Sequence, residues 1–128
     1  MTSSKEIIGE PLVIGGRQLS LSRAVRAGKM IYLTGQIPMR NGTPMTEGSI
    51  EEQTRSCIEN IRATLQLANC DLDNIVKTTV WLKDRADFPG FDKTYGEYFS
   101  NSPPARTGLV CEFLVDIKVE IECVAYAG

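Results

Sequence analysis

The sequence predicts an α+β fold in which one mixed β-sheet carries two helices packed on one face. Segments with strand-like patterns and segments with helical spacing follow one another in the order β-β-α-β-α-β-β. Each helical segment has a single apolar stripe, which is best buried against a common sheet face. The chain has 128 residues, a length that fits one domain, 1–128, with its own core.

The first two strands are expected to form a hairpin. Residues 18–25 alternate apolar and polar side chains as in a half-buried strand, and Ala27-Gly28-Lys29 supplies a turn. Residues 30–34 are typical of the returning strand. Residues 35–48 contain two prolines and an Asn-Gly pair, which predicts a loop.

The first helix is expected over residues 50–69. It begins with a capping box, in which Ser49 and Glu52 each accept a hydrogen bond from the other's backbone N–H. Apolar side chains then recur at helical spacing, and Asn69 is the expected end of the helix.

The second half of the chain alternates strands with one more helix. Residues 75–82 are rich in β-branched side chains and predict a central strand. Residues 87–99 predict a helix with its aromatic rings mainly on one side and its proline in the first turn. Residues 107–114 and 119–126 are expected to be the last two strands, joined by a tight turn around Asp116. Two helices leave the other sheet face open, so we expect an oligomer that buries it.

Composition excludes several classes of chemistry. The chain has no histidine, which removes Ser-His-Asp triads, Cys-His dyads and histidine-based metal sites. Its net charge of −2 comes without a basic stripe, so nucleic acid is not an expected partner. No signal peptide or membrane-spanning stretch is recognisable, which predicts a cytoplasmic protein without a membrane partner.

The four cysteines do not predict a metal site. Cys57, Cys70, Cys111 and Cys123 show no C-x-x-C spacing, and no histidine can complete a zinc site. We expect four buried or half-buried free thiols, with a secreted disulfide-bonded domain as the lesser alternative.

Arg106 is the first residue that could carry chemistry. It follows Ser-Pro-Pro-Ala at the start of a predicted strand, where its guanidinium offers a rigid fork for a carboxylate. From the pattern alone, a surface arginine paired with a nearby acid is the simpler interpretation.

Two acidic side chains form the second candidate. In a strand, Glu120 and Glu122 point to the same side, and adjacent like charges are unfavourable unless they are solvated, paired or used. If a subunit closes that face, a carboxylate there could have a raised pKa and act as a base. Thr34 and Gly35 end the second predicted strand, where they could line a pocket or form a plain turn.

Several blocks together make the chain similar to the Rid family, also called YjgF or the reactive intermediate deaminases. These blocks are Tyr32-Leu-Thr-Gly-Gln-Ile-Pro38, Glu52-Gln-Thr-Arg55, Glu59-Asn-Ile61, Val76-Lys-Thr-Thr-Val80, Pro104-Ala-Arg106 and Val119-Glu-Ile-Glu122. The resemblance implies a chorismate-mutase-like fold and a homotrimer with a pocket at each subunit interface. It also implies hydrolysis of reactive enamines and imines without a cofactor, typified by 2-aminoacrylate or 2-iminopropionate giving pyruvate and ammonia.

The resemblance also assigns roles by position. Arg106 resembles the arginine that binds the substrate carboxylate, and Glu120 resembles the glutamate that orients and activates water. Thr34 stands where many members have serine, and Gly35 would shape the pocket beside it. No metal site is implied.

The chain departs from the family at positions that would tune substrate choice. The family's pocket tyrosine is Leu21 here, and the cysteine of its P-A-R-S-C block is Gly108. A pocket-side asparagine becomes Asp92, and Arg23 replaces a glutamine. Two alternatives therefore stay open: a deaminase of a larger enamine such as 2-aminomuconate, and a non-enzymatic ligand-binding or regulatory protein.

Overall fold

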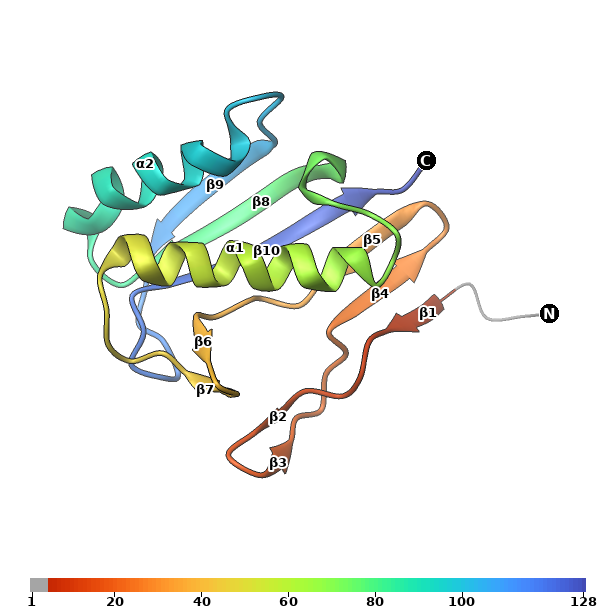
Figure 1. Cartoon of the computed structure of the whole chain (residues 1–128), viewed down its shortest axis with the longest axis horizontal. Coiled ribbons are helices and arrows are strands. Elements are labelled where there is room, and N and C mark those ends of the chain that lie inside the picture. Colours follow the sequence, from red (N-terminus) through yellow and green to blue (C-terminus); the bar gives the residue numbers. More distant parts are fainter. Residues whose placement is uncertain (1–4) are drawn as a thin grey trace.

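The fold is a six-stranded mixed sheet with two helices on one face, seen in a computed structural model that describes residues 5–128 (Figure 1). Across the sheet the strands are β1 (Lys5–Ile8), β4 (Ala24–Ala27), β5 (Met30–Leu33), β10 (Val119–Tyr126), β8 (Ile75–Leu82) and β9 (Ala105–Val110). Only β8 and β9 pair in parallel, and the other neighbours are antiparallel. The predicted α+β class is therefore confirmed.

The remaining elements connect or cover this sheet. The two helices are α1 (Ile50–Gln66) and α2 (Phe88–Phe99), and the short 3-10 helices are η1 (Leu72–Asn74) and η2 (Arg85–Asp87). Two small hairpins lie outside the main sheet: β2 (Val13–Ile14) with β3 (Arg17–Gln18), and β6 (Met39–Arg40) with β7 (Thr43–Pro44).

Strand β10 shows how the core is divided between the two sheet faces. Its odd-numbered residues from Val119 to Ala125 are buried under the helices, whereas its even-numbered residues from Glu120 to Tyr126 are partly or fully exposed. Successive side chains of a strand point to opposite faces, so one face forms the core and the other stays uncovered. The uncovered face of the single chain matches the expectation from the sequence.

The first helix forms as predicted. Ser49 is its N-cap, and its hydroxyl accepts from the Glu52 N–H at 3.1 Å while the Glu52 carboxylate accepts from the Ser49 N–H at 3.0 Å. The α-helix ends at Gln66, and tighter turns continue to Asn69, whose positive φ of 59° stops the helix.

The predicted hairpin of the last two strands is wrong. Strand β9 covers residues 105–110 rather than 107–114, and it pairs in parallel with β8. Strand β10 pairs with the other side of β8, so β8 lies between them. Residues 111–118 cross the end of the sheet. There the Cys111 N–H donates to the Leu82 carbonyl, and the Lys83 N–H donates to the Lys118 carbonyl. Local patterns found the strands, but their order depends on pairings between distant segments.

The predicted strand 18–25 is also only partly correct. Gln18 ends β3, residues 19–23 are irregular, and the main-sheet strand β4 begins at Ala24. Strand β1 was missed, because its sequence is mostly exposed and has no buried alternation.

Within the predicted loop 35–48 a small hairpin turns at Asn41 and Gly42, both with positive φ. None of the described helices is long and apolar enough to span a membrane.

We predict that Ser49→Ala lowers the free energy of unfolding by about 1 kcal/mol, because the Glu52 N–H loses its side-chain acceptor at the helix end. Urea unfolding monitored by circular dichroism measures this change. Thr46→Ala, at an exposed position just before the helix, is the matched control and should stay within about 0.5 kcal/mol of the parent. Equal stability of the two variants would contradict the cap.

Candidate functional site

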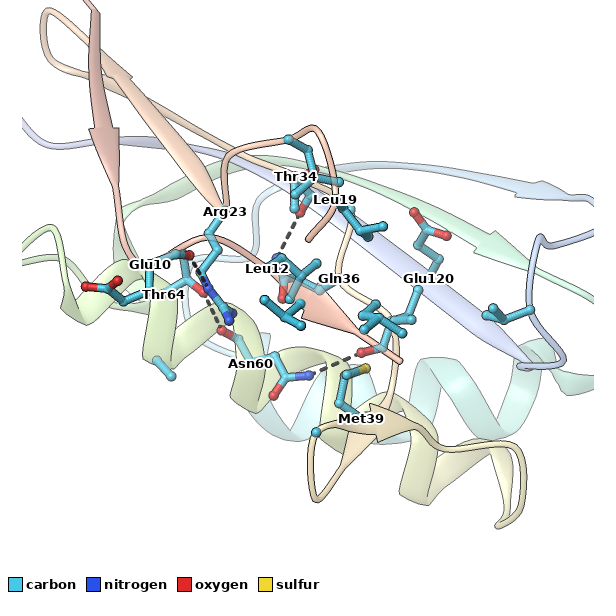
Figure 2. Close-up of a pocket in the computed structure, with 18 of the residues that line it drawn as sticks. Glu10, Leu12, Leu19, Arg23, Thr34, Gln36, Met39, Asn60, Thr64 and Glu120 are labelled. Carbon is cyan, nitrogen blue, oxygen red and sulfur yellow. Dashed lines mark hydrogen bonds between the residues drawn. The ribbon is translucent and has the colours of Figure 1, made fainter. Parts of the chain in front are cut away.

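A cavity of about 680 Å³ opens between the β2–β3 hairpin, the end of β5, helix α1 and the loop after β9 (Figure 2). Most of its lining is apolar, and its polar groups are few. The apolar residues are Leu12, Val13, Ile14, Leu19, Leu21, Ile37, Met39, Ala63, Leu67, Phe113, Leu114 and Val115. An apolar cavity with a few placed polar groups is typical of a small-molecule site.

Glu120 lines this cavity as a half-buried carboxylate. Burial raises the pKa of the Glu120 carboxyl above its usual range, and the Glu122 carboxylate two residues along the same strand raises it further. The predicted placement of both side chains on one sheet face is consistent with their exposure. A carboxylate with a raised pKa is a better proton acceptor than an ordinary one.

Gly35 makes room for this carboxylate. A Cβ atom built at Gly35 would collide with Oε2 of Glu120 and lie 3.1 Å from its Cδ. The φ of Gly35 is not in the left-handed region, so close approach rather than backbone conformation is the reason for glycine here.

The backbone around Gly35 is fixed from both sides. The Gln36 N–H donates to the Ile121 carbonyl at 2.7 Å, and the Ile121 N–H donates back to Gln36 at 3.0 Å. Asn60 of α1 donates through Nδ2 to the Ile37 carbonyl at 3.1 Å (Figure 2). Asn60 belongs to the Glu59-Asn-Ile61 block of the family resemblance. No role is assigned to that block, so sequence reasoning alone misses this hydrogen bond.

Thr34 and Leu21 line the same cavity as Glu120 and Gly35. The Thr34 backbone is held in place because its N–H donates to the Arg23 carbonyl at 3.0 Å. Arg23, a departure from the family, donates through Nε to the Glu10 carbonyl at 2.8 Å and borders the cavity (Figure 2).

Arg106 lies elsewhere, in a second cavity of about 500 Å³ at the free edge of the sheet. Its Nη1 donates to the Asp92 carboxylate at 2.8 Å. Its guanidinium carbon is 4.8 Å from the ring centroid of Tyr95 and 5.6 Å from those of Phe88 and Phe91. These cation–π contacts with α2 hold the guanidinium in a defined place.

Arg106 and Glu120 point to opposite faces of the sheet. Arg106 pairs with Thr78, and Glu120 pairs with Trp81 on the same strand β8. Residues 78 and 81 are an odd number of positions apart, so they face opposite sides, and their pairing partners do likewise. One chain therefore brings four of the five expected site residues together and leaves Arg106 apart from them.

The cysteines are free, as expected: Cys57, Cys70 and Cys123 are buried and Cys111 is half-buried. Burial raises the pKa of Cys57 well above its usual value and that of Cys123 to about 12. Thiols of this kind are poor nucleophiles near neutral pH. Within residues 5–128, no three His, Cys, Asp or Glu side chains are grouped so that they could hold a metal ion.

The fold and the cavity define a small α+β protein with one uncovered sheet face and a carboxylate in an apolar pocket. The sequence model described as Endoribonuclease L-PSP matches residues 17–127. The chain belongs to this family, which is the YjgF/Rid family of the sequence analysis.

Relatives and solved structures agree with this assignment. A RutC family protein of Pyrococcus horikoshii is 41% identical over 107 residues, covering 82% of this chain and 85% of that protein. The E. coli YjgF gene product is 31% identical with a TM-score of 0.85, over 96% of this chain and 99% of that one. E. coli TdcF, solved with bound serine, is 27% identical with a TM-score of 0.85, over 96% of this chain and 99% of that one.

We predict that Gly35→Ala displaces the Glu120 side chain without unfolding the protein. The colliding atoms are the end of a flexible side chain, so the free energy of unfolding should change by less than about 1 kcal/mol. The displaced carboxyl should gain solvent, and its pKa should fall toward the ordinary range. Carbon-13 NMR titration of the Glu120 carboxyl measures this shift.

Gly96→Ala is the matched control. Gly96 lies in α2 with open space where a Cβ would go, so this variant should stabilise the protein by about 0.8 kcal/mol and leave the Glu120 titration unchanged. An unaltered Glu120 titration in Gly35→Ala would show that Gly35 does not make room for the carboxylate.

Proposed function

We propose that the protein is a cofactor-independent hydrolytic deaminase of reactive 2-enamine and 2-imino acids, producing a 2-keto acid and ammonia. The observation that carries this proposal is the Glu120 carboxylate, which lies against Gly35 in a largely apolar cavity with a raised pKa. Family membership supports it, and so does the serine bound to TdcF, because serine carries the α-carboxylate that Arg106 would hold. The free thiols fit a reducing compartment, and we propose the cytoplasm.

The proposed active form is a homotrimer with its sites between subunits. A small substrate cannot touch Arg106 and Glu120 of one chain, because they lie on opposite sheet faces. Every residue of β9 is exposed at the free sheet edge, including the apolar Leu109 and Val110. We propose that this edge packs on the neighbour's Glu120 cavity, which would complete the site and bury the apolar residues.

The proposed mechanism uses water and one proton acceptor. Arg106 binds the carboxylate of the substrate and thereby places its imine carbon beside the neighbour's Glu120. Glu120 accepts a proton from water as the oxygen attacks that carbon of the protonated imine, which gives a neutral carbinolamine. Protonated Glu120 then gives the proton to the nitrogen. As the C–N bond breaks, the hydroxyl proton of the carbinolamine passes to Glu120 or solvent, the C=O bond forms, and ammonia and the 2-keto acid leave. Thr34 would hydrogen-bond the carboxylate or the nitrogen end of the substrate.

A larger enamine is the second candidate substrate. The cavity beside Glu120 is spacious and apolar at Leu21, and nothing lies within 4 Å of where a Cβ at Gly108 would be. We do not propose RNA as the substrate, because the net charge is −2 and no basic stripe is available to neutralise phosphates. A purely regulatory protein is the remaining alternative, and it would hydrolyse no imine in an oxidase-coupled assay.

We predict that Arg106→Ala and Glu120→Gln are each inactive but complement one another when mixed. The assay couples an amino-acid oxidase, which generates the imine, to semicarbazide, which traps any imine that the protein does not hydrolyse. After unfolding and refolding of an equal mixture, about a quarter of the wild-type activity should return, because each site needs one intact residue from each of two neighbours.

The same mixture separates the proposal from its alternatives. Separately refolded variants, mixed only afterwards, serve as the control and should remain inactive. Activity of Arg106→Ala equal to that of the wild type would contradict the role of Arg106. Two inactive variants that never complement would contradict sites shared between subunits.

We predict that Glu122→Gln extends activity to lower pH. The Glu122 carboxylate raises the pKa of Glu120, so removing its charge lowers that pKa and keeps the base deprotonated in more acidic solution. The acid limb of the kcat/KM profile should move to lower pH, while the value on the alkaline side should change less than about twofold. Glu47→Gln, at an exposed position, removes the same charge and should leave the profile in place. An unmoved acid limb in Glu122→Gln would show that Glu120 is not the titrating base.

A further inference from the structure

The cavity that contains Arg106 has an unusual distribution of charge. Its lining consists of seven apolar residues and two arginines, Arg85 and Arg106. The apolar residues are Val80, Leu82, Phe88, Phe91, Gly108, Leu109 and Val110. Asp92 binds Arg106 but does not line the cavity. A ligand in this space therefore meets carbon atoms and two cations.

The two arginines belong to opposite ends of this cavity. Arg106, Gly108 and Val110 alternate along β9 and so share one face, over a length of about 13 Å between residues 106 and 110. Val110 pairs with Leu82, the last residue of β8, and Arg85 begins η2 three residues later. Arg106 is thus at one end of the row of side chains formed by Arg106, Gly108 and Val110, and Arg85 lies beyond its other end.

The middle of the row is left open by Gly108. Nothing lies within 4 Å of the position that a Cβ atom would take there. The rings of Phe88 and Phe91 at the start of α2 line the same cavity. An extended carbon chain could lie over Gly108 and contact these rings, with a charged group at each end.

The two cations differ in what already neutralises them. Arg106 has Asp92 at 2.8 Å and three aromatic rings around it. Arg85, in contrast, forms no ion pair with an N–O distance of 4.0 Å or less within residues 5–128. An arginine beside an apolar cavity without an acidic partner is available for an anion.

We propose that the substrates are 2-imino dicarboxylic acids, with the carboxylate next to the imine on Arg106 and the distal carboxylate on Arg85. This substrate class rests on the proposed deaminase function and identifies Arg85 as a specificity-determining residue for it. The carbon chain between the carboxylates packs on Phe88 and Phe91. A monocarboxylic imine of the same length would leave Arg85 unpaired.

The test compares 2-iminoglutarate with 2-iminopentanoate, each generated in the assay by an oxidase acting on the parent amino acid. Wild-type protein should have the higher kcat/KM for 2-iminoglutarate. Arg85→Gln should lower that value at least roughly tenfold and change the value for 2-iminopentanoate less than about twofold, because only the charged hydrogen bonds to the distal carboxylate are lost. Arg85→Lys should restore part of the loss.

Lys93→Gln is the control, since it removes one positive charge from an exposed position of α2 outside the cavity. It should leave both values unchanged. Calorimetry with the stable products 2-oxoglutarate and 2-oxopentanoate gives a second measurement that needs no turnover. Arg85→Gln should weaken binding of 2-oxoglutarate alone.

The outcomes separate the two proposals. If the wild type hydrolyses both imines equally and Arg85→Gln changes neither, the dicarboxylate inference is overturned and the deaminase function stands. If neither imine is hydrolysed, the deaminase function fails for these substrates, and calorimetry decides on Arg85 separately. Equal binding of both keto acids by wild type and Arg85→Gln overturns the inference in that case.

Discussion

Successive side chains of β10 lie alternately on the covered and the uncovered face of the sheet, and the candidate site depends on this alternation. The helices cover Val119, Ile121 and the other odd positions, and this burial places Glu120 and Glu122 together on the opposite side. A shift of register by one residue would bury two carboxylates in the core. The stability of the fold and the position of the Glu120 carboxylate therefore come from the same pattern, and Gly35 only has to leave space for that carboxylate.

The same alternation explains why Glu120 and Arg106 line two separate cavities of one chain. Paired residues of neighbouring strands point to the same sheet face. Arg106 on β9 therefore faces α2, like its partner on β8, while Glu120 faces away. The aromatic rings of α2 that hold Arg106 are also part of the core, since Phe91 and Tyr95 are buried there. Moving Arg106 toward Glu120 within one chain would break the core, whereas in the proposed homotrimer a second copy would bring its Arg106 there through the exposed edge of β9.

What could be predicted from the sequence follows from the range of the interactions involved. Strands 75–82 and 119–126 and the capped start of α1 were predicted at their observed bounds, because their patterns are local and strong. The position of β9 beside β8 rather than β10 was not, because strand order depends on distant pairing. Four of the five expected site residues line one cavity, whereas the separation of Arg106 from them follows from the strand register. Arg85 gave no sequence signal, since its position relative to Arg106 depends on the parallel pairing of β8 and β9.

In the proposed deaminase, which has no histidine, the proton acceptor is the Glu120 carboxylate, whose surroundings change its pKa, and this has a cost in stability. Its raised pKa means that the folded protein binds a proton more readily than the unfolded chain does. The contribution of Glu120 to stability is therefore fully present below the ordinary glutamate pKa and is lost as the pH rises through the folded value. At neutral pH the deprotonated form is the destabilised one, and it is also the form that accepts a proton from water. The proposed substrate is already reactive and would need only such a modest base, so one half-buried carboxylate would serve instead of a larger catalytic apparatus.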